Sequence, residues 1–155
     1  MEQLSSEELA KLFEDGIGML TYFGHSSQNT LEFNIDDPNK YNNKGKYPLF
    51  MINGCLAGDI FIYDTLRKAG GGLSLSEKYM LTKDRGSIGF LASSHFGIVN
   101  YLNIYINSFY VNVATKDYGK TIGEVQKSSL ARLLANTPNG DFFARMHSEP
   151  VSYTH

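Results

Sequence analysis

The sequence predicts an α/β domain built on a mainly parallel sheet. Two apolar runs, at 19–23 and 48–52, are rich in aromatic and branched residues and stop at turn signals, as buried strands do. The residues between them are numerous enough for a crossover connection, so the two strands can lie parallel in one sheet. Helix signals alternate with these strand-like runs along the chain, which is the order of an α/β layered fold.

The first element is a predicted helix. Ser5 and Glu8 have the spacing of a capping box, in which each residue satisfies a free N–H of the other's backbone. Leu4 and Leu9 have the spacing of a hydrophobic staple, and Gly16 ends the helix. The first strand, 19–23, follows directly.

The connection between the first two strands is polar. We expect at most one short helix in it, near 37–43. The second strand, 48–52, leads to Gly54, which permits close backbone approach or a positive φ before the turn. The stretch 56–72 has no clear preference for helix or strand.

Two more capping boxes open the later helices. Ser74 with Glu77 predicts a helix to about residue 83, and Thr121 with Glu124 predicts one to about residue 136. Between them, 87–92 reads as a third buried strand.

The rest of the chain is a helix and a tail. The run 97–114 has apolar residues at helical spacing. The tail, 141–155, reads as one short helix and an extended end. No internal repeat or interdomain linker is evident, so we expect residues 1–155 to form a single domain.

Composition excludes several classes of protein. The net charge of −2 offers no electrostatic reason to expect a nucleic-acid partner. No apolar run reaches the roughly 18 residues that a membrane span needs, and there is no signal-peptide pattern. The single cysteine, Cys55, excludes an internal disulfide.

Two reactive residues follow the first two strands. Gly24-His25 comes after the first strand and Gly54-Cys55 after the second. Because the carboxyl ends of parallel strands meet at one edge of a sheet, we expect His25 and Cys55 to lie together there. A cysteine thiolate attacks carbonyl carbons, and a histidine can take the thiol proton and deliver it to the leaving amine. The backbone N–H groups of Cys55 and Ser26 could stabilise the oxyanion.

Other readings of these residues stay open. Cys55 could be a small buried core residue of an unrelated α/β domain. His95 could be a substrate contact or a satisfied polar group at a strand end. The four histidines and one cysteine show no pair at zinc-ligand spacing, so no metal site is predicted. The run 36–39 could offer oxygen ligands to a structural calcium, but it lacks the EF-hand pattern and reads as a solvated turn.

The flanks of these residues resemble a known family. The segments 18–26, 48–55, 75–77 and 86–94 look like the gingipain family of cysteine peptidases, peptidase family C25. Within that family, 55–59 and 92–97 look closer to the PorU-like sortases of the type IX secretion system.

The resemblance implies a caspase-like, three-layer α/β sandwich with a His–Cys dyad. His25 falls on the catalytic histidine of the family and Cys55 on its nucleophile, and no cofactor is implied. We expect further residues around the two strand ends to line the substrate site: Gly24, Gly54, Ser93, Ser94 and His95.

The resemblance also implies a role and a place. The sortase branch acts as an endopeptidase or transpeptidase in the cell envelope or outside the cells of Bacteroidetes bacteria. Its protein substrates carry C-terminal sorting domains, which it removes before it can pass the new carboxyl end to a lipopolysaccharide.

The sequence departs from the family in two ways. Ser26 stands where the family usually has a second glycine, although its backbone N–H remains available. The family also has strands upstream of the histidine and a segment beyond residue 155, so we expect the chain to be a partial catalytic domain. An inactive caspase-like binding module of the secretion machinery is the alternative function.

Overall fold

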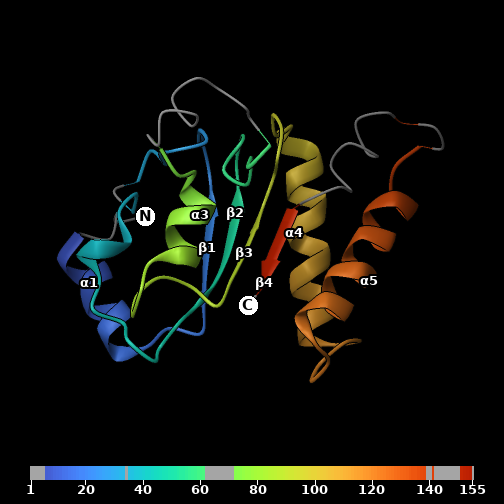
Figure 1. Ribbon diagram of the computed structural model, residues 1–155. Coiled ribbons are helices and arrows are strands. Elements are labelled where there is room, and N and C mark those ends of the chain that lie inside the picture. The colour runs from blue at the N-terminus through green and yellow to red at the C-terminus, as the bar shows by residue number, and fades with distance from the viewer. Residues whose placement is uncertain (1–5, 34, 62–71, 139–140, 142–150, 155) are drawn as a thin grey trace. The chain divides into compact units, whose positions relative to one another are not determined.

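The computed structural model describes residues 6–33, 35–61, 72–138, 141 and 151–154. The chain divides into two compact units, Met1–Phe96 with Pro150–His155, and Gly97–Glu149. The elements appear in Figure 1 in this order: α1 (Ser6–Asp15), β1 (Met19–Phe23), η1 (Pro38–Lys40), β2 (Leu49–Asn53), α3 (Leu75–Leu81), β3 (Gly89–Ala92), α4 (Val99–Ala114), α5 (Ile122–Ala135) and β4 (Val151–Thr154).

The first unit contains a sheet with the order β1-β2-β3-β4. β1, β2 and β3 are parallel, as predicted, and β1 pairs with β2 so that Phe23 lies opposite Asn53. β4 is antiparallel to β3 and pairs Gly89 with Thr154. The extended end expected for the tail is therefore a fourth strand of the sheet, which the sequence pattern did not indicate.

An aromatic cluster forms the core on one face of this sheet. Phe50, on the central strand β2, contacts Phe90 of β3 and Phe13 of α1, with ring centroids 5.6 and 5.9 Å apart. It also contacts Tyr79 of α3 at 4.4 Å. All four side chains are fully buried. Because every residue of β2 is buried, the strand reads as a continuous apolar run, as parallel strands covered on both faces do. The core therefore holds the strand that leads to Cys55.

Buried polar groups tie the loops to this core. The Tyr79 hydroxyl donates to the Ile35 carbonyl at 2.8 Å. The Asn43 amide donates to the carbonyls of Lys46 and Gly86, and its oxygen accepts the N–H of Gly86. These bonds hold the long connection between β1 and β2 against the turn that precedes β3.

The second unit is a pair of helices, α4 and α5, which pack against each other. α5 begins with the predicted capping box, in which Thr121 and Glu124 satisfy each other's backbone N–H groups. The turn before α5 is held by Asp117, whose buried carboxylate accepts a 2.7 Å bond from the Lys120 ammonium.

The helix signals were accurate to within two or three residues, with one exception. The capping box of Ser74 and Glu77 opens α3, which ends at Leu81. The short helix expected near 37–43 is a single 3-10 turn, because Asp37 caps it and Tyr41 is already extended. Leu4, Ser5 and the short helix expected in the tail lie outside the described residues. Within the described ranges, no helix is long and apolar enough to cross a membrane.

Candidate active site

The carboxyl ends of β1 and β2 bring the two predicted reactive residues to one edge of the sheet. Phe23 and Asn53 are partners in the register, so His25 and Cys55 each lie two residues beyond a matched pair. The Gly24 N–H continues the ladder by donating to the Asn53 carbonyl at 3.2 Å. The two loops therefore leave the sheet side by side, as the sequence predicted (Figure 1).

A side-chain hydrogen bond joins the two loops directly. The Ser26 hydroxyl donates to the Cys55 carbonyl at 2.7 Å. Gly54 makes this approach feasible, because a Cβ at that position would lie 2.1 Å from the Ser26 Oγ and 2.7 Å from the Gly24 carbonyl oxygen. Of the two roles considered for Gly54, close approach is the one observed, since the positive φ falls on Leu56 instead, at 58°.

The loop after β3 holds the cysteine loop from the other side. The N–H of Leu56 donates to the His95 carbonyl at 3.0 Å, and the N–H of Gly58 donates to the Ser93 carbonyl at 2.9 Å. Leu56 thus adopts the left-handed region, which is unfavourable for a residue with a Cβ, within a loop that is bonded on both sides.

The histidine loop is a small hairpin. The Glu32 N–H donates to the His25 carbonyl, the Ser27 N–H donates to the Thr30 carbonyl, and Ser26 bridges to Leu31 between them. Ser26 and Leu31 thus form a non-hydrogen-bonded antiparallel pair, in which the N–H groups of both residues point away from the partner strand. The Ser26 N–H finds no acceptor within the described part of the chain. An oxyanion donor must likewise be free of a partner within the protein.

Tyr22 anchors this hairpin, a role that the sequence analysis did not assign. Its hydroxyl donates to the His25 carbonyl at 2.6 Å and accepts the N–H of Glu32 at 3.3 Å. A Cβ at Gly24 would lie 2.8 Å from the same hydroxyl oxygen, so a larger residue there would displace the tyrosine ring. Burial raises the pKa of Tyr22 above its ordinary value of 10.0, which keeps the hydroxyl protonated as a donor.

Gln28 is a second anchor that the sequence analysis missed. Its side-chain amide donates to the Asp59 carbonyl at 3.0 Å, which adds another bond between the histidine and cysteine loops. The backbone carbonyl of Gln28 accepts the N–H of Leu75 at the start of α3. No local sequence pattern signals such bonds, because their partners lie about 30 or more positions away.

The two reactive side chains differ in exposure. His25 is exposed, and its ring forms no hydrogen bond within the described residues. Cys55 is half-buried and reduced. A pocket of about 260 Å³ opens beside the histidine, and residues 25–27 and 30–32 line it. The loops after β1 and β2 therefore carry an exposed histidine and a half-buried cysteine at one edge of the sheet.

The other predicted site residues surround this edge in different ways. Ser93 is buried and presents its carbonyl to the cysteine loop, whereas Ser94 and His95 are half-buried. The His95 ring bonds the carbonyl of Phe96 at 2.8 Å through Nδ1. Gly54 lies in close contact with the carbonyl of Gly24. None of these five residues is among those that line the pocket beside His25.

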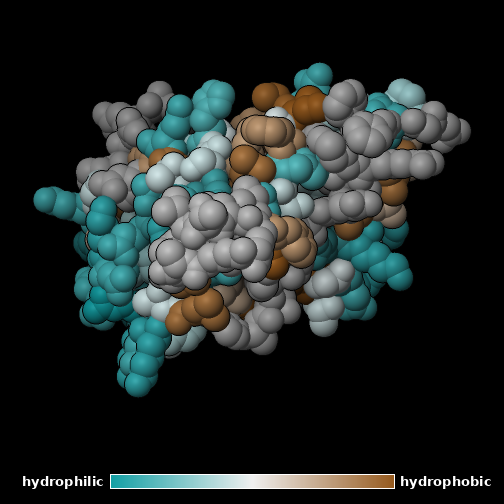
Figure 2. Space-filling view, turned by 45° about the horizontal axis from the view of Figure 1, so that its top comes forward, coloured by the Kyte–Doolittle hydropathy of each residue, from teal (hydrophilic) through white to brown (hydrophobic). Residues whose placement is uncertain are grey.

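Exposed aromatic side chains follow all three parallel strands. Phe23 ends β1, and Phe61 and Phe96 lie in the loops after β2 and β3, with exposed fractions of 45%, 71% and 70%. In Figure 2, which tips the upper end of Figure 1 towards the viewer, brown hydrophobic side chains are interspersed with teal hydrophilic ones. These loops therefore present exposed apolar side chains beside polar ones.

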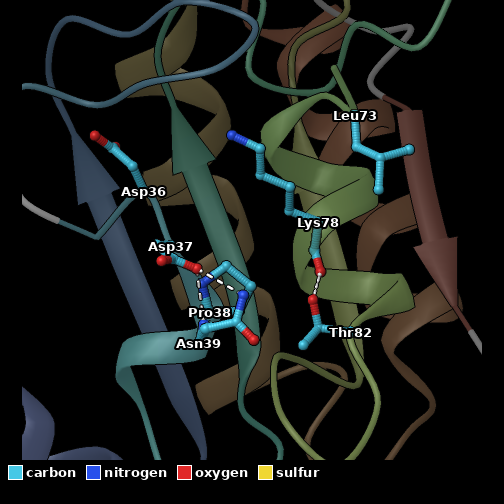
Figure 3. Close-up of a pocket in the computed structure, with 7 residues that line it drawn as sticks. All are labelled: Asp36, Asp37, Pro38, Asn39, Leu73, Lys78 and Thr82. Carbon is cyan, nitrogen blue, oxygen red and sulfur yellow. Dashed lines mark hydrogen bonds between the residues drawn. The ribbon is translucent and has the colours of Figure 1, made fainter. Parts of the chain in front are cut away.

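The run considered for calcium lines a separate pocket of about 440 Å³, drawn in Figure 3. Its carboxylates accept local hydrogen bonds. Asp36 accepts the backbone N–H of Leu31, and Asp37 accepts both the backbone N–H and the side-chain amide of Asn39. The backbone bond from Asn39 lowers the pKa of Asp37. The Lys78 side chain extends from α3 over the same hollow (Figure 3), so a cationic group already lies at this pocket.

Comparison with known proteins finds a family model and solved structures that this chain resembles. The model of peptidase family C25 matches residues 2–152. No curated protein gives a significant match. Solved structures do match: the Arg-specific cysteine proteinase gingipain R (RgpB) has 13% identity and a TM-score of 0.79, and the complex of Porphyromonas gingivalis RgpB pro- and mature domains has 15% and 0.80.

A third match, described only as a protease, has 11% identity and a TM-score of 0.72. The matches to gingipain R cover 99% of this chain, and the third covers 94%. Conversely, this chain spans only 36% of the length of each matching chain. The likeness confirms the caspase-like α/β fold expected from the sequence, with a partial sheet.

Proposed function

Because the chain belongs to peptidase family C25, we propose that it is part of a cysteine peptidase in which Cys55 is the nucleophile and His25 the proton carrier. The observation that carries the proposal is the matched register of β1 and β2, which leads both residues to one sheet edge, where Ser26 joins their loops. The chain spans about a third of the length of the matching structures, so the activity proposed is that of the larger protein.

The reaction would proceed by acyl transfer. His25 takes the proton of the Cys55 thiol, and the sulfur attacks the carbonyl carbon of the scissile peptide. The resulting oxyanion receives hydrogen bonds from the backbone N–H groups of Ser26 and Cys55. The intermediate then collapses as His25 returns the proton to the leaving amine, which leaves a thioester on Cys55. Water or a second amine releases the acyl group, so hydrolysis and transpeptidation share the first half of the reaction.

The exposed His25 ring is compatible with this role. Catalytic hydrogen bonds in ligand-free enzymes are often long or absent and tighten only when substrate is bound. The histidine backbone is nevertheless well fixed, by Tyr22 on one side and Glu32 on the other. In the proposed mechanism, rotation of the His25 side chain brings its ring to the thiol.

The pH dependence of Cys55 alkylation by iodoacetamide tests the dyad. An ordinary thiol reacts with a midpoint near ~8.5, whereas a thiol paired with an imidazole reacts well below that pH. We expect a low-pH shoulder in the wild type that His25→Ala lacks, and Cys55→Ala should lose both alkylation and peptidase activity while remaining folded. Wild-type and His25→Ala profiles that coincide near pH 8.5 would reject the dyad.

We further propose a PorU-like sorting role in the cell envelope or outside the cell. The support is the resemblance of residues 55–59 and 92–97 to the sortase branch. The substrates would be cargo proteins with C-terminal sorting domains, cut and then either hydrolysed or transferred. Mass spectrometry of such a cargo, with and without an added amine, distinguishes the two fates. Cleavage at sites scattered through the cargo would contradict sorting.

A binding module without activity is the second candidate. One observation favours it, namely that the exposed His25 ring bonds nothing within the described residues. This candidate predicts normal thiol alkylation kinetics and binding of a sorting domain that survives Cys55→Ala. The alkylation experiment above therefore separates the two functions.

A further inference from the structure

We propose that the side chain of Ser26 is a positioning residue, which holds the Cys55–Leu56 peptide group and so sets the direction of the Cys55 thiol. The inference rests on the proposed dyad and assigns a part to the Ser26 hydroxyl that is separate from the oxyanion role of its backbone N–H.

The peptide group after Cys55 is held at both of its polar ends. Its carbonyl accepts the Ser26 hydroxyl at 2.7 Å, and its N–H, which belongs to Leu56, donates to the His95 carbonyl at 3.0 Å. A peptide group is planar, so two bonds on opposite sides of it fix its orientation. That orientation restrains ψ of Cys55 and φ of Leu56, and so the position of the Cys55 Cβ, from which the thiol extends.

The resulting conformation of Leu56 is unfavourable for a residue that has a Cβ. Its φ of 58° lies in the left-handed region, where a Cβ crowds the following carbonyl. Such a residue persists only when its surroundings impose the conformation. The Ser26 and His95 bonds supply that constraint from the loops after β1 and β3.

The packing around Gly54 makes Ser26 a close fit. A Cβ at residue 54 would lie 2.1 Å from the Ser26 Oγ and 3.0 Å from its Cβ, so serine and glycine occupy adjoining space without a gap for another atom. The Ser26 side chain is neutral and changes no charge near the thiol. Any effect of its removal on thiol reactivity would therefore come from geometry.

The test compares Ser26→Ala with Thr82→Val. Both changes delete a part-buried hydroxyl that bonds a backbone carbonyl in the first unit, Cys55 O in one case and Lys78 O at 2.6 Å in the other. Ser26→Ala also keeps the backbone N–H, so the oxyanion donor remains. Ser26→Gly is the second variant, since it removes the hydroxyl together with the side-chain carbon that Ser26→Ala leaves as a methyl group.

In Ser26→Ala we expect Cys55 alkylation at pH 6.5 to slow by about tenfold, because the thiol loses its alignment with the histidine that activates it. The kcat should fall by about 10- to 100-fold while KM stays within about twofold, as expected when only the transition-state geometry is lost. Thr82→Val should keep the wild-type profile and kcat. Thermal melting checks that all variants fold.

The outcomes separate this inference from the proposed function. A wild-type low-pH shoulder that both Ser26 variants retain would overturn the positioning role and leave the dyad standing. An equal loss in Thr82→Val would also overturn it, by showing a general effect of destabilisation. A wild type that behaves like His25→Ala would reject the dyad, and with it this inference.

Discussion

Tyr22 and His25 are joined by a 2.6 Å hydrogen bond in which the tyrosine hydroxyl donates to the histidine backbone carbonyl. The bond fixes the main chain at a residue whose side chain is exposed. Burial is the main cause of the raised pKa of Tyr22, so the donor remains protonated at neutral and mildly alkaline pH.

We therefore expect Tyr22→Phe to impair catalysis more than folding. The change removes two hydrogen bonds, one to the His25 carbonyl and one from the Glu32 N–H, each of which contributes about 1 kcal/mol to stability. The misplaced histidine should lower kcat by ~10-fold or more. Steady-state kinetics and urea unfolding measure the two effects, and Tyr118→Phe, at an exposed tyrosine, is the control. Unchanged kcat in Tyr22→Phe would contradict the anchor role.

Gly54→Ala should disrupt the contact between the two loops. The added methyl group would collide with the Ser26 hydroxyl and with the Gly24 carbonyl, and overpacking of this kind costs about 1–3 kcal/mol. Gly18→Ala is the matched control, because a Cβ there meets nothing within 4 Å. Urea unfolding of the two variants should therefore differ clearly, and equal stabilities would show that the loops separate without cost.

Asn43→Ala should be strongly destabilising. The buried amide bonds Lys46 and Gly86 as a donor and Gly86 as an acceptor, and its loss leaves buried backbone groups unpaired. We expect the free energy of unfolding to fall by about 2–3 kcal/mol. The neighbouring Asn42 is exposed, so Asn42→Ala should leave the unfolding midpoint close to that of the wild type.

The pair of Asp117 and Lys120 predicts a loss of stability in acid. The bond from Lys120 is the main cause that lowers the pKa of Asp117 below its ordinary value of 3.8. A carboxylate with a depressed folded-state pKa stabilises the protein above its unfolded pKa, and this contribution disappears as the pH falls through the folded value. Stability should therefore decline below about pH 4.

Asp117→Asn should remove part of this acid dependence, which thermal melting from pH 7 to pH 3 measures. The control is Asp84→Asn, because the Asp84–Lys44 pair is largely exposed and surface pairs contribute little. An acid transition that is the same in Asp117→Asn and wild type would assign it to other carboxylates.

The sequence was sufficient for the features that depend on neighbouring residues. Capping boxes at Ser74 and Thr121 act within one helical turn, so their spacing identified α3 and α5 directly. The buried runs of β2 and β3 were recognisable because parallel strands covered on both faces are continuously apolar. The run at 19–23 was expected to be equally buried, but β1 is only half-buried and Phe23 is exposed, because β1 has a strand partner on only one side in the described part of the chain. Placing His25 and Cys55 at one edge then followed from the parallel topology alone.

The features that depend on distant partners could not be predicted. β4 has no strong pattern of its own, and its place is set by pairing with β3. Ser26 was assigned only a backbone role, because nothing in the sequence shows that its hydroxyl meets the carbonyl of Cys55. Gly54 was expected to permit either close approach or a positive φ, and only the packing of the Ser26 side chain distinguishes the two.

The pairing of β3 with β4 bears on how the protein folds during synthesis. All of α4 and α5 lies between these strands in the sequence, so the ribosome must release that helical pair before β4 can dock. Until then the backbone groups on one side of β3 have no strand partner, and such an edge can pair with another chain. β4 therefore joins the sheet only after α4 and α5 have been synthesised, and ribosome-stalled chains that lack residues 151–154 should aggregate more readily than chains that include them.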